Sequence, residues 1–343
     1  NPIPNYNFYQ DSLDVRQAYG DLNLDLGGKK AVTLRIGRQE LKYGRERLIG
    51  GFNWNNVAQS FDAARLMVKL DKIQVDFFGA RKVKIDRNGW NNWDEKDDLL
   101  GLYIQAKMIK NHQIHVYSFY RNTPNAGNAT PPLNRNLDEI TVGFRVTGKQ
   151  KTLDYTMEFA YQFGKAGVGA NRNDINALAF IGGFGFTCPC PSKPRLGLEI
   201  NYASGDDSPN AGAYRTFDNL FPTNHLHYGF MDLASLQNLV DFIIHFSMKP
   251  AKNWLFKIDY HILALDTSRD NFYHAGRGIR RAASSTPASE FLGTELDITV
   301  KYKVNSFLSF LFGVSKFWAG DYLKDTGTHD NAEFAYFQTV LKF

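Results

Sequence analysis

Strict alternation of large apolar and polar side chains most constrains this sequence, because a period of two is the period of a β-strand. Between Leu153 and Phe163 every odd position is large and apolar, whereas Asp154, Thr156 and Glu158 lie on the other face. The pattern recurs along most of the chain, and no long window carries apolar residues at helical spacing. We therefore predict an all-β fold.

Fifteen segments show this alternation and are predicted to be strands. Their approximate bounds are residues 15–26, 31–40, 61–70, 73–83, 97–109, 112–121, 138–148, 152–163, 174–186, 194–204, 236–249, 252–266, 291–304, 306–318 and 332–343. Short connections (27–30, 71–72, 110–111, 149–151, 187–193, 250–251 and 305) alternate with long polar ones (41–60, 84–96, 122–137, 164–173, 205–235, 267–290 and 319–331). The connections therefore predict one end of short turns and one end of long loops.

Short turns at one end and long loops at the other are typical of an outer-membrane β-barrel. The apolar face must then meet lipid and the charged face a wet lumen, because an outward Arg or Lys costs roughly 2 to 4 kcal/mol near the midplane. Membrane helices need runs of about 20 apolar residues, and the sequence has none. We predict a single domain over residues 1–343 that is an all-β, transmembrane antiparallel β-barrel.

The last strand ends in Phe343, a terminal aromatic residue that is common in outer-membrane barrels, and we expect this end to be periplasmic. Counting back from it predicts periplasmic short turns and extracellular long loops. The first predicted strand, 15–26, would then run downward from the outside. Because single-chain barrels have an even strand number, we expect an odd number of N-terminal strands to be missing from this segment.

Several motifs, in this order along the chain, resemble the alginate-export family of outer-membrane porins. They include VRQAY at 15–19, LRIGRQEL at 34–41, EFAYQ at 158–162, YASGD at 202–206, TFDNLFPTNH at 216–225, YGFMD at 228–232 and GTELD at 293–297. The resemblance implies a monomeric barrel of eighteen strands in the full protein, with about fifteen in this segment. It does not carry the polymer over, because one fold serves several substrates. The late turn at 303–306 is shorter than the turn that helps to close the pore in the characterised exporter.

Basic residues concentrate between Val15 and Gly50, where eight of them stand against four acidic ones. Arginine offers a planar fork that matches carboxylates, so inward arginines would suit an acidic solute. Alternatively, lumen charges only pair across strands and hydrate the pore. The candidate pore-lining and substrate-contacting residues are Arg35, Arg38, Arg47, Arg65, Lys107, Arg145, Glu158, Asp241, Lys257 and Lys301.

Two further regions allow other chemistry. In the long segment 205–235, Asp206 and Asp207 are candidate calcium ligands. The Asp and His residues of this segment also suggest a surface hydrolase, but no spacing of nucleophile, base and orienting group can be identified. The plainer interpretation is a packed extracellular loop that folds over the pore mouth. Cys188 and Cys190 could hold a soft metal or meet a redox partner, and a disulfide across one residue would be strained. Tyr43 could stack on a sugar ring.

The sequence thus predicts a channel of the bacterial outer membrane and no enzyme. It would pass an anionic polysaccharide or an acidic small solute through a lumen containing arginines. Alternatives are a general or aromatic-acid porin, and a structural barrel that anchors a periplasmic or surface partner. Expected partners are outer-membrane lipid, the anionic solute and a periplasmic protein, without nucleic acid. No cofactor is expected other than calcium in the loops.

Overall fold

The computed structural model describes residues 14–86, 89–124, 136–168, 171–208 and 212–342. Fifteen of its strands form one antiparallel sheet in which each strand pairs with the next along the sheet. The strands are β1 Ala18–Gly27, β2 Lys30–Gln39, β3 Phe61–Leu70, β4 Ile73–Lys84, β5 Asn92–Ala106, β6 His112–Thr123, β7 Asn136–Gln150, β8 Leu153–Val168, β9 Asn171–Thr187, β10 Arg195–Ala203, β11 Leu239–Met248, β12 Trp254–Ala264, β15 Phe291–Lys303, β16 Leu308–Ala319 and β17 Ala332–Leu341. All fifteen predicted strands are confirmed.

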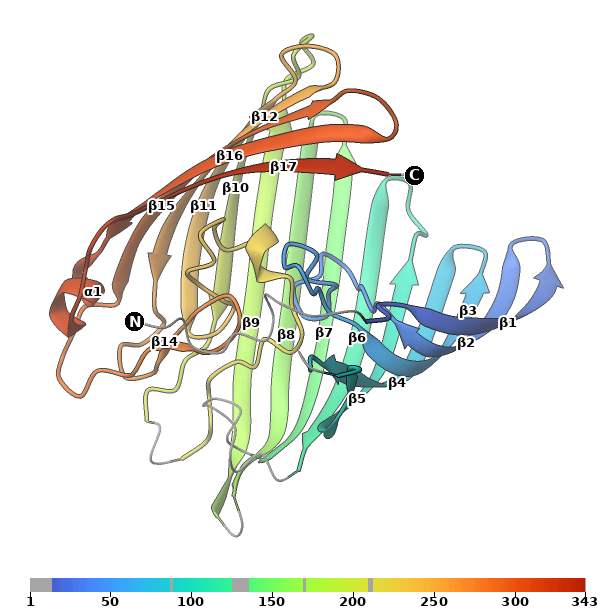
Figure 1. Ribbon diagram of the computed structural model, residues 1–343, viewed down its shortest axis with the longest axis horizontal. Helices are drawn as coiled ribbons and strands as arrows, with labels where there is room; N and C mark the ends of the chain where they lie inside the picture. Colours follow the sequence, from blue (N-terminus) through green and yellow to red (C-terminus); the bar gives the residue numbers. More distant parts are fainter. Residues whose placement is uncertain (1–13, 87–88, 125–135, 169–170, 209–211, 343) are drawn as a thin grey trace.

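The sheet is strongly curved (Figure 1), and β1 and β17 each pair with a single neighbour within the described residues. Small elements lie in the connections: the hairpin of β13 (Phe272–Tyr273) and β14 (Ile279–Arg281), the 3-10 turn η1 (Asn224–Leu226) and the helix α1 (Asp321–Thr326). No helix in the described ranges is long and apolar enough to span a membrane.

One expected long connection is mostly strand. We predicted a loop over 164–173, but β8 continues to Val168 and β9 already begins at Asn171, leaving only residues 169–170 outside the described part. The pairing explains the extension, since Ala166 and Ile175 continue the buried face of their strands. Most of the expected loop 122–137 lies outside the described residues.

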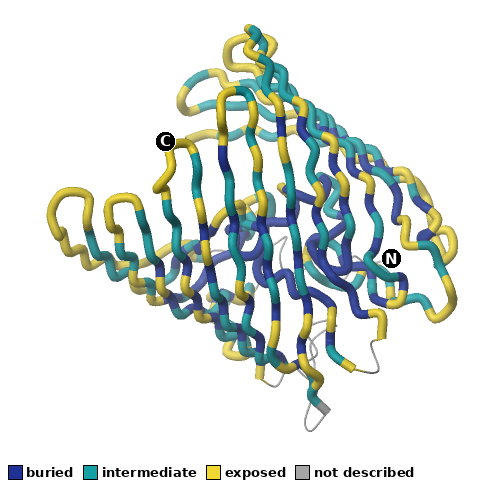
Figure 2. Tube along the Cα trace, turned by 180° about the vertical axis from the view of Figure 1, so that it is seen from behind, coloured by how far each residue is buried: buried dark blue, intermediate teal, exposed yellow. Residues whose placement is uncertain are grey.

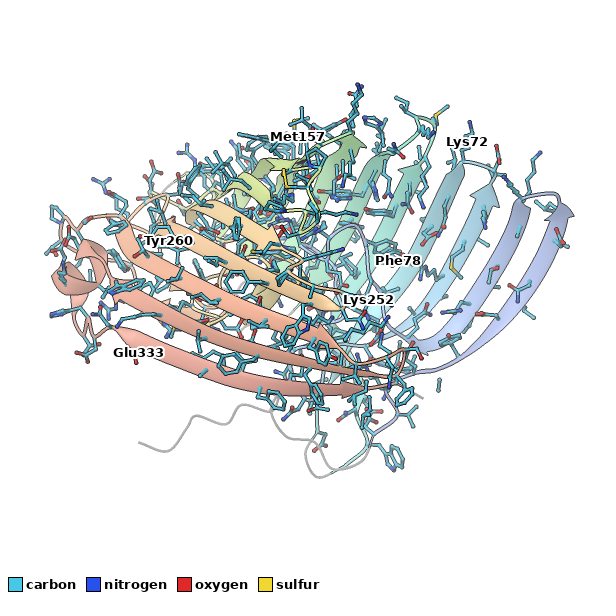
Figure 3. All side chains as sticks on the ribbon, turned by 90° about the horizontal axis from the view of Figure 1, so that it is seen from above. Lys72, Phe78, Met157, Lys252, Tyr260 and Glu333 are labelled. Carbon is cyan, nitrogen blue, oxygen red and sulfur yellow. A yellow bond between two sulfur atoms is a disulfide. The ribbon has the colours of Figure 1, made fainter. Side chains whose placement is uncertain are left out.

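Burial alternates in the inverted sense that the sequence predicted. Met157 on β8 is 39% exposed although it is apolar, and its neighbour Glu158 is only 6% exposed. Phe77 and Phe78 on β4 differ in the same way, with 56% and 0% exposure. Met157 and Phe78 are labelled in Figure 3. The outer face therefore carries exposed apolar side chains, as in barrels that stand in lipid, and the side chains of the inner face are covered.

The inner face is covered by the chain's own long connections, which fold into the curve of the sheet (Figures 1 and 2). We call segments 41–60 and 205–238 the inward loops. They meet in a short parallel bridge between Ile49 and Phe221, where the amide of Phe221 donates to Leu48 and that of Gly50 to Phe221, both at 2.8 Å. Both bridge residues are fully buried. Burying such side chains contributes about 1.5 to 3 kcal/mol each. The hydrophobic core therefore lies between the inward loops and the fifteen-stranded sheet, which we call the wall.

Aromatic rings of the wall receive the first inward loop. Tyr43 stacks on Phe78 with ring centroids 5.3 Å apart and lies 4.6 Å from Tyr103, whose ring is parallel to that of Tyr117 at 5.8 Å. Tyr43 is only 8% exposed. Protein neighbours therefore cover the ring of Tyr43, which the sequence suggested as a stacking surface for a sugar.

Candidate functional site

Arg47 fixes the first inward loop to the sheet. Its guanidinium donates to Glu199 at 2.6 Å, to Asn201 at 2.9 Å and to the Tyr228 hydroxyl at 3.0 Å, so it joins β10 to both inward loops. Burial alone would lower the pKa of Arg47, but the negative charge of Glu199 outweighs it and holds this pKa above the ordinary value. Arg47 is therefore a permanent cation inside the molecule.

Below this anchor lies a cavity of about 440 Å³, which we call the arginine cavity. It lies toward the short-turn ends of the strands that line it. Five Arg and Lys side chains and four carboxylates line it: Arg45, Arg47, Arg145, Arg195 and Lys257, with Asp154, Glu199, Asp259 and Asp297. Side chains from both inward loops and the wall thus converge on one space.

Carboxylates of the sheet pair with the cations that the sheet contributes to this cavity. Arg195 donates to both carboxylate oxygens of Asp154 at 2.9 and 2.6 Å, and Lys257 donates to Asp259 at 3.0 Å. Arg145 faces Glu158 at 3.9 Å, and its buried Nε has no hydrogen-bond partner. Paired lumen charges, the alternative allowed by the sequence, thus describe much of the wall.

Arg45 differs from these cations. Its side chain is exposed to the cavity and makes no hydrogen bond or ion pair with any part of the chain that the structure describes. The surrounding protein and the neighbouring Arg47 cation lower the pKa of Arg45, because both disfavour another positive charge there. Arg45 therefore presents a guanidinium fork without a hydrogen-bond partner to a solute that enters the cavity.

His227 closes the arginine cavity from the second inward loop. Its Nε2 lies 2.7 Å from the Arg45 carbonyl oxygen, which requires a protonated Nε2 that donates to the carbonyl. Burial, with Arg47 and Arg45 nearby, holds the pKa of His227 well below its ordinary value. The imidazole is neutral at pH 7 and supports the loop through this one hydrogen bond.

A smaller pocket of about 380 Å³ adjoins the arginine cavity, since both are lined by Arg145 and Thr147. We call it the side pocket. Arg65 lies there, bonded to Asp76 and 5.2 Å above the ring of Tyr43. Arg47, Arg65, Arg145 and Lys257 are therefore brought together around adjoining spaces.

The other predicted residues lie elsewhere. Glu158 lies behind Arg145 and accepts a hydrogen bond from the Tyr117 hydroxyl at 3.2 Å, and Asp241 pairs with His261 at 3.1 Å. Lys107 and Lys301 are exposed near the short-turn end and make no ion pair within the described ranges. None of these four lines the arginine cavity.

Arg35 and Arg38 are separated from the arginine cavity as well. Arg35 on β2 donates to both oxygens of Asp21 at 2.8 and 2.7 Å and stacks on Tyr19. Arg38 lies on the outer face of the sheet, because residues two positions apart on a strand share a face and Ile36 is exposed on the outside. It pairs there with Asp62 at 2.8 Å, so it does not line the inner cavities.

Two anchors hold the second inward loop. Asp218 is bonded to Arg121 and lies 3.3 Å from Arg277, while Gln162 exchanges two hydrogen bonds with its backbone. Burial would raise the pKa of Asp218, but the two guanidiniums outweigh it and hold this pKa below the ordinary value. The anchor is therefore charged at neutral pH.

The second anchor uses backbone amides. Met231 donates to Glu295 at 2.9 Å and Phe230 donates to Asp297 at 3.2 Å, both on β15. The preceding Gly229 has φ +94°, and a Cβ there would lie 2.6 Å from both Glu295 carboxylate oxygens. Only glycine fits this approach of loop to wall.

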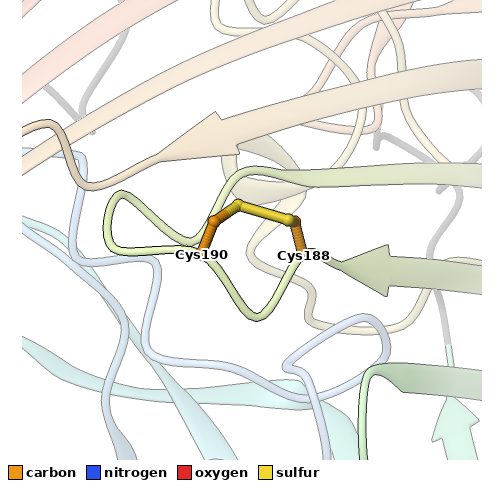
Figure 4. Close-up of a disulfide and its surroundings, with 2 residues drawn as sticks. All are labelled: Cys188 and Cys190. Carbon is orange, nitrogen blue, oxygen red and sulfur yellow. A yellow bond between two sulfur atoms is a disulfide. The ribbon is translucent and has the colours of Figure 1, made fainter.

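The two calcium candidates make separate contacts in the part of the chain that the structure describes. Asp207 is exposed and pairs with Arg215 at 3.3 Å, whereas Asp206 is buried and accepts from the amide of Ser208 at 3.1 Å. Among the described residues, no three His, Cys, Asp or Glu side chains form a metal-binding group. Cys188 and Cys190 form a disulfide in the connection between β9 and β10 (Figure 4), although we expected a disulfide across one residue to be strained.

Sequence reasoning missed Arg45, Arg195 and His227 as site residues. Arg45 belongs to the basic run before Gly50, but its position in a loop hid the side chain's direction. Arg195, the first residue of β10, follows the inward parity of Glu199, which could have identified it. His227 carried no signal beyond its residue type.

Comparisons with known proteins agree with this architecture. A family model described as alginate export matches residues 6–337. No curated protein matches the chain. Among solved structures, the chain is similar to OccK11 (OpdR) of Pseudomonas aeruginosa, with a TM-score of 0.56 and 12% identity over 91% of this chain and 78% of that one. For OccAB1 of Acinetobacter baumannii the TM-score is 0.53, with 15% identity over 91% of this chain and 75% of that one. For the outer membrane protein OprD of P. aeruginosa the TM-score is 0.54, with 13% identity over 91% of this chain and 78% of that one. At such low identities these likenesses show the fold alone.

Proposed function

Since the chain belongs to the alginate export family, we propose that it is an outer-membrane channel in which the arginine cavity selects anionic solutes, with carboxylated polysaccharides and small acids as the substrate class. The observation that carries the proposal is Arg45. Five Arg and Lys side chains line the cavity, and among these five only Arg45 is exposed and without a hydrogen-bond or ion-pair partner in the described chain. Positive side chains at a constriction lower the barrier for anions and raise it for cations.

The paired cations support this role without supplying it alone. Arg47 and Arg195 are held by Glu199 and Asp154, so their charges are largely compensated. They still present N–H groups at fixed positions, which suits repeated carboxylates that move from one fork to the next.

Ion selectivity tests the proposal. In planar bilayers under a salt gradient, we expect a reversal potential on the anion side for the natural chain and a shift toward cations for Arg45→Ala. Arg215→Ala removes the same charge from an exposed ion pair that lines none of the cavities, so its reversal potential should stay near that of the natural chain. Equal reversal potentials for Arg45→Ala and the natural chain would exclude the arginine cavity as the selective element.

Block by polymers extends the test. Short uronic-acid oligomers added to one side should interrupt the current of the natural chain, and neutral oligomers of the same length should not. If both sugars interrupt the current equally, size rather than charge decides passage.

We further propose that the long loops face the outside of the cell and the short turns the periplasm. The connections 40–60, 204–238 and 265–290 are much longer than the turns at the other end of the sheet, which matches the loop asymmetry of outer-membrane barrels. A cysteine introduced at the exposed Arg215 should react with an impermeant maleimide on intact cells, whereas one at the exposed Lys252 in a short turn should react only after lysis. The reverse pattern would invert the orientation.

A further inference from the structure

A separate cavity of about 680 Å³ lies on the opposite side of segment 222–232 from the arginine cavity. We call it the aliphatic cavity. Pro222, Met231 and Asp232 line it, whereas residues 225–227, 229 and 230 of the same segment line the arginine cavity. The two cavities share no lining residue. The aliphatic cavity is bounded by the long-connection ends of β4 and β5, so it lies toward the long-loop end of the sheet.

Its lining combines two chemistries. Aliphatic side chains come from three separate parts of the chain, with Val57 from the first inward loop, Val83 and Ile85 at the end of β4, and Ile279 from β14. The arginine cavity, by contrast, is lined mainly by charged and polar side chains. A fully hydrophilic sugar acid would leave this apolar surface unmatched.

Positive charge exceeds negative charge in the same lining. Four cations, Lys82, Lys84, Arg277 and Arg280, face two carboxylates, Asp94 and Asp232. Asp232 is also engaged by His225 at 3.0 Å.

Lys82 is the best placed of these cations to meet a ligand. Its side chain is half-buried and makes no hydrogen bond or ion pair in the part of the chain that the structure describes. Arg277, by contrast, is already held by Asp218. A half-buried ammonium with no fixed partner gains most from an anion that enters with its own apolar group.

We propose that the aliphatic cavity binds small alkyl carboxylates, with Lys82 receiving the carboxylate and the aliphatic side chains covering the alkyl chain. A volume of 680 Å³ is within the usual range for small-molecule sites. If the chain conducts anions as proposed above, this site is where such acids are captured before they pass the inward loops. That transport role rests on the proposed function; the binding itself does not.

Binding is therefore measured without current. The full chain is reconstituted in nanodiscs, and hexanoate is titrated while its saturation-transfer NMR signal is followed, with empty nanodiscs as the reference. We expect saturable binding that weakens about tenfold in Lys82→Met, the factor expected for one charge-assisted hydrogen bond. Lys324→Met on α1 removes an equal charge from an exposed pair and should bind hexanoate like the natural chain.

Two further ligands test the two halves of the site separately. Hexanol lacks the charge and should bind weakly and equally to the natural chain and Lys82→Met, while glucuronate lacks the alkyl chain and should bind more weakly than hexanoate. Ile85→Ser should weaken hexanoate and leave glucuronate unchanged, which shows a folded variant with a damaged apolar wall. Absence of saturable hexanoate binding, equal binding of glucuronate and hexanoate, or no loss in Lys82→Met would overturn the proposal.

The outcomes separate this inference from the channel proposal. Hexanoate binding with an unchanged Arg45→Ala reversal potential keeps the site and rejects the selective role of the arginine cavity. A shifted Arg45→Ala reversal potential without hexanoate binding does the opposite.

Discussion

Replacing Asp218 by alanine should release the second inward loop from the wall. The substitution removes the carboxylate that lies between Arg121 and Arg277, although Arg121 keeps two bonds of 2.8 Å to Asp97. Breaking a buried ion pair from one side costs about 3 to 5 kcal/mol, because a remaining charge, here that of Arg277, stays buried without its partner. Even the lower figure raises the released population roughly a hundredfold, since each 1.4 kcal/mol is a factor of ten.

Single-channel recording measures this release. We expect longer or more frequent openings in Asp218→Ala, because segment 222–232 separates the two cavities. Asp207→Ala is the matched control: the same substitution in the same loop removes an exposed partner of Arg215, and such pairs contribute only about 0 to 1 kcal/mol. Asp218→Asn keeps an oxygen for the amide of Leu220 and should open the channel less than alanine does.

Folding is checked by the heat-dependent shift of the band on a denaturing gel, because a fully hydrogen-bonded membrane β-sheet resists detergent until it is boiled. A folded Asp218→Ala whose conductance and open times equal those of the natural chain would refute the anchoring role of this carboxylate.

Three other perturbations test separate parts of the structure. Gly229→Ala should loosen the same loop, because its Cβ would lie 2.6 Å from the Glu295 carboxylate; Gly212→Ala, also at positive φ but with open space around it, is the control, and limited proteolysis of the two variants compares loop release. Lowering the pH below about 6.5 should favour opening. The pKa of His227 is depressed in the docked loop, so the released loop takes up a proton at a higher pH than the docked loop does. The docking free energy is therefore complete above about pH 6.5 and declines below it. His227→Gln should make channel opening less dependent on pH between 7.5 and 5.5, and a pH response as steep as that of the natural chain would assign the effect to another group. Met157→Lys on the outer face should destabilise the chain in lipid vesicles by about 2 to 4 kcal/mol, whereas Thr156→Lys on the inner face should cost less; equal losses in reversible unfolding would contradict the assignment of faces.

The wall of this protein follows from its sequence. Alternation with period two is a property of the extended backbone itself, so Met157 and Glu158 are assigned to opposite faces without any knowledge of their neighbours. The strand order was equally accessible, because each strand in the sheet pairs with its predecessor through a connection at one end.

Short-range charge pairs were partly accessible for the same reason. Arg145 and Glu158 face each other in the register of two adjacent strands, and a hairpin register fixes such partners. Whether the pair leaves a guanidinium nitrogen unsatisfied, as Nε of Arg145 is, depends on side-chain packing and cannot be read from the register.

The site itself was decided by the tertiary structure. Arg47 meets Glu199 across 152 positions of sequence, and Arg121 meets Asp218 across 97, contacts that exist only because the inward loops fold onto the wall. No local periodicity encodes such contacts. The direction of a loop side chain is not set by a repeating backbone conformation, and its partner depends on the path of the whole segment. For this reason the sequence identified the basic cluster around Arg47, while only the folded chain determined that Glu199 compensates Arg47 and that Arg45 remains open to the cavity.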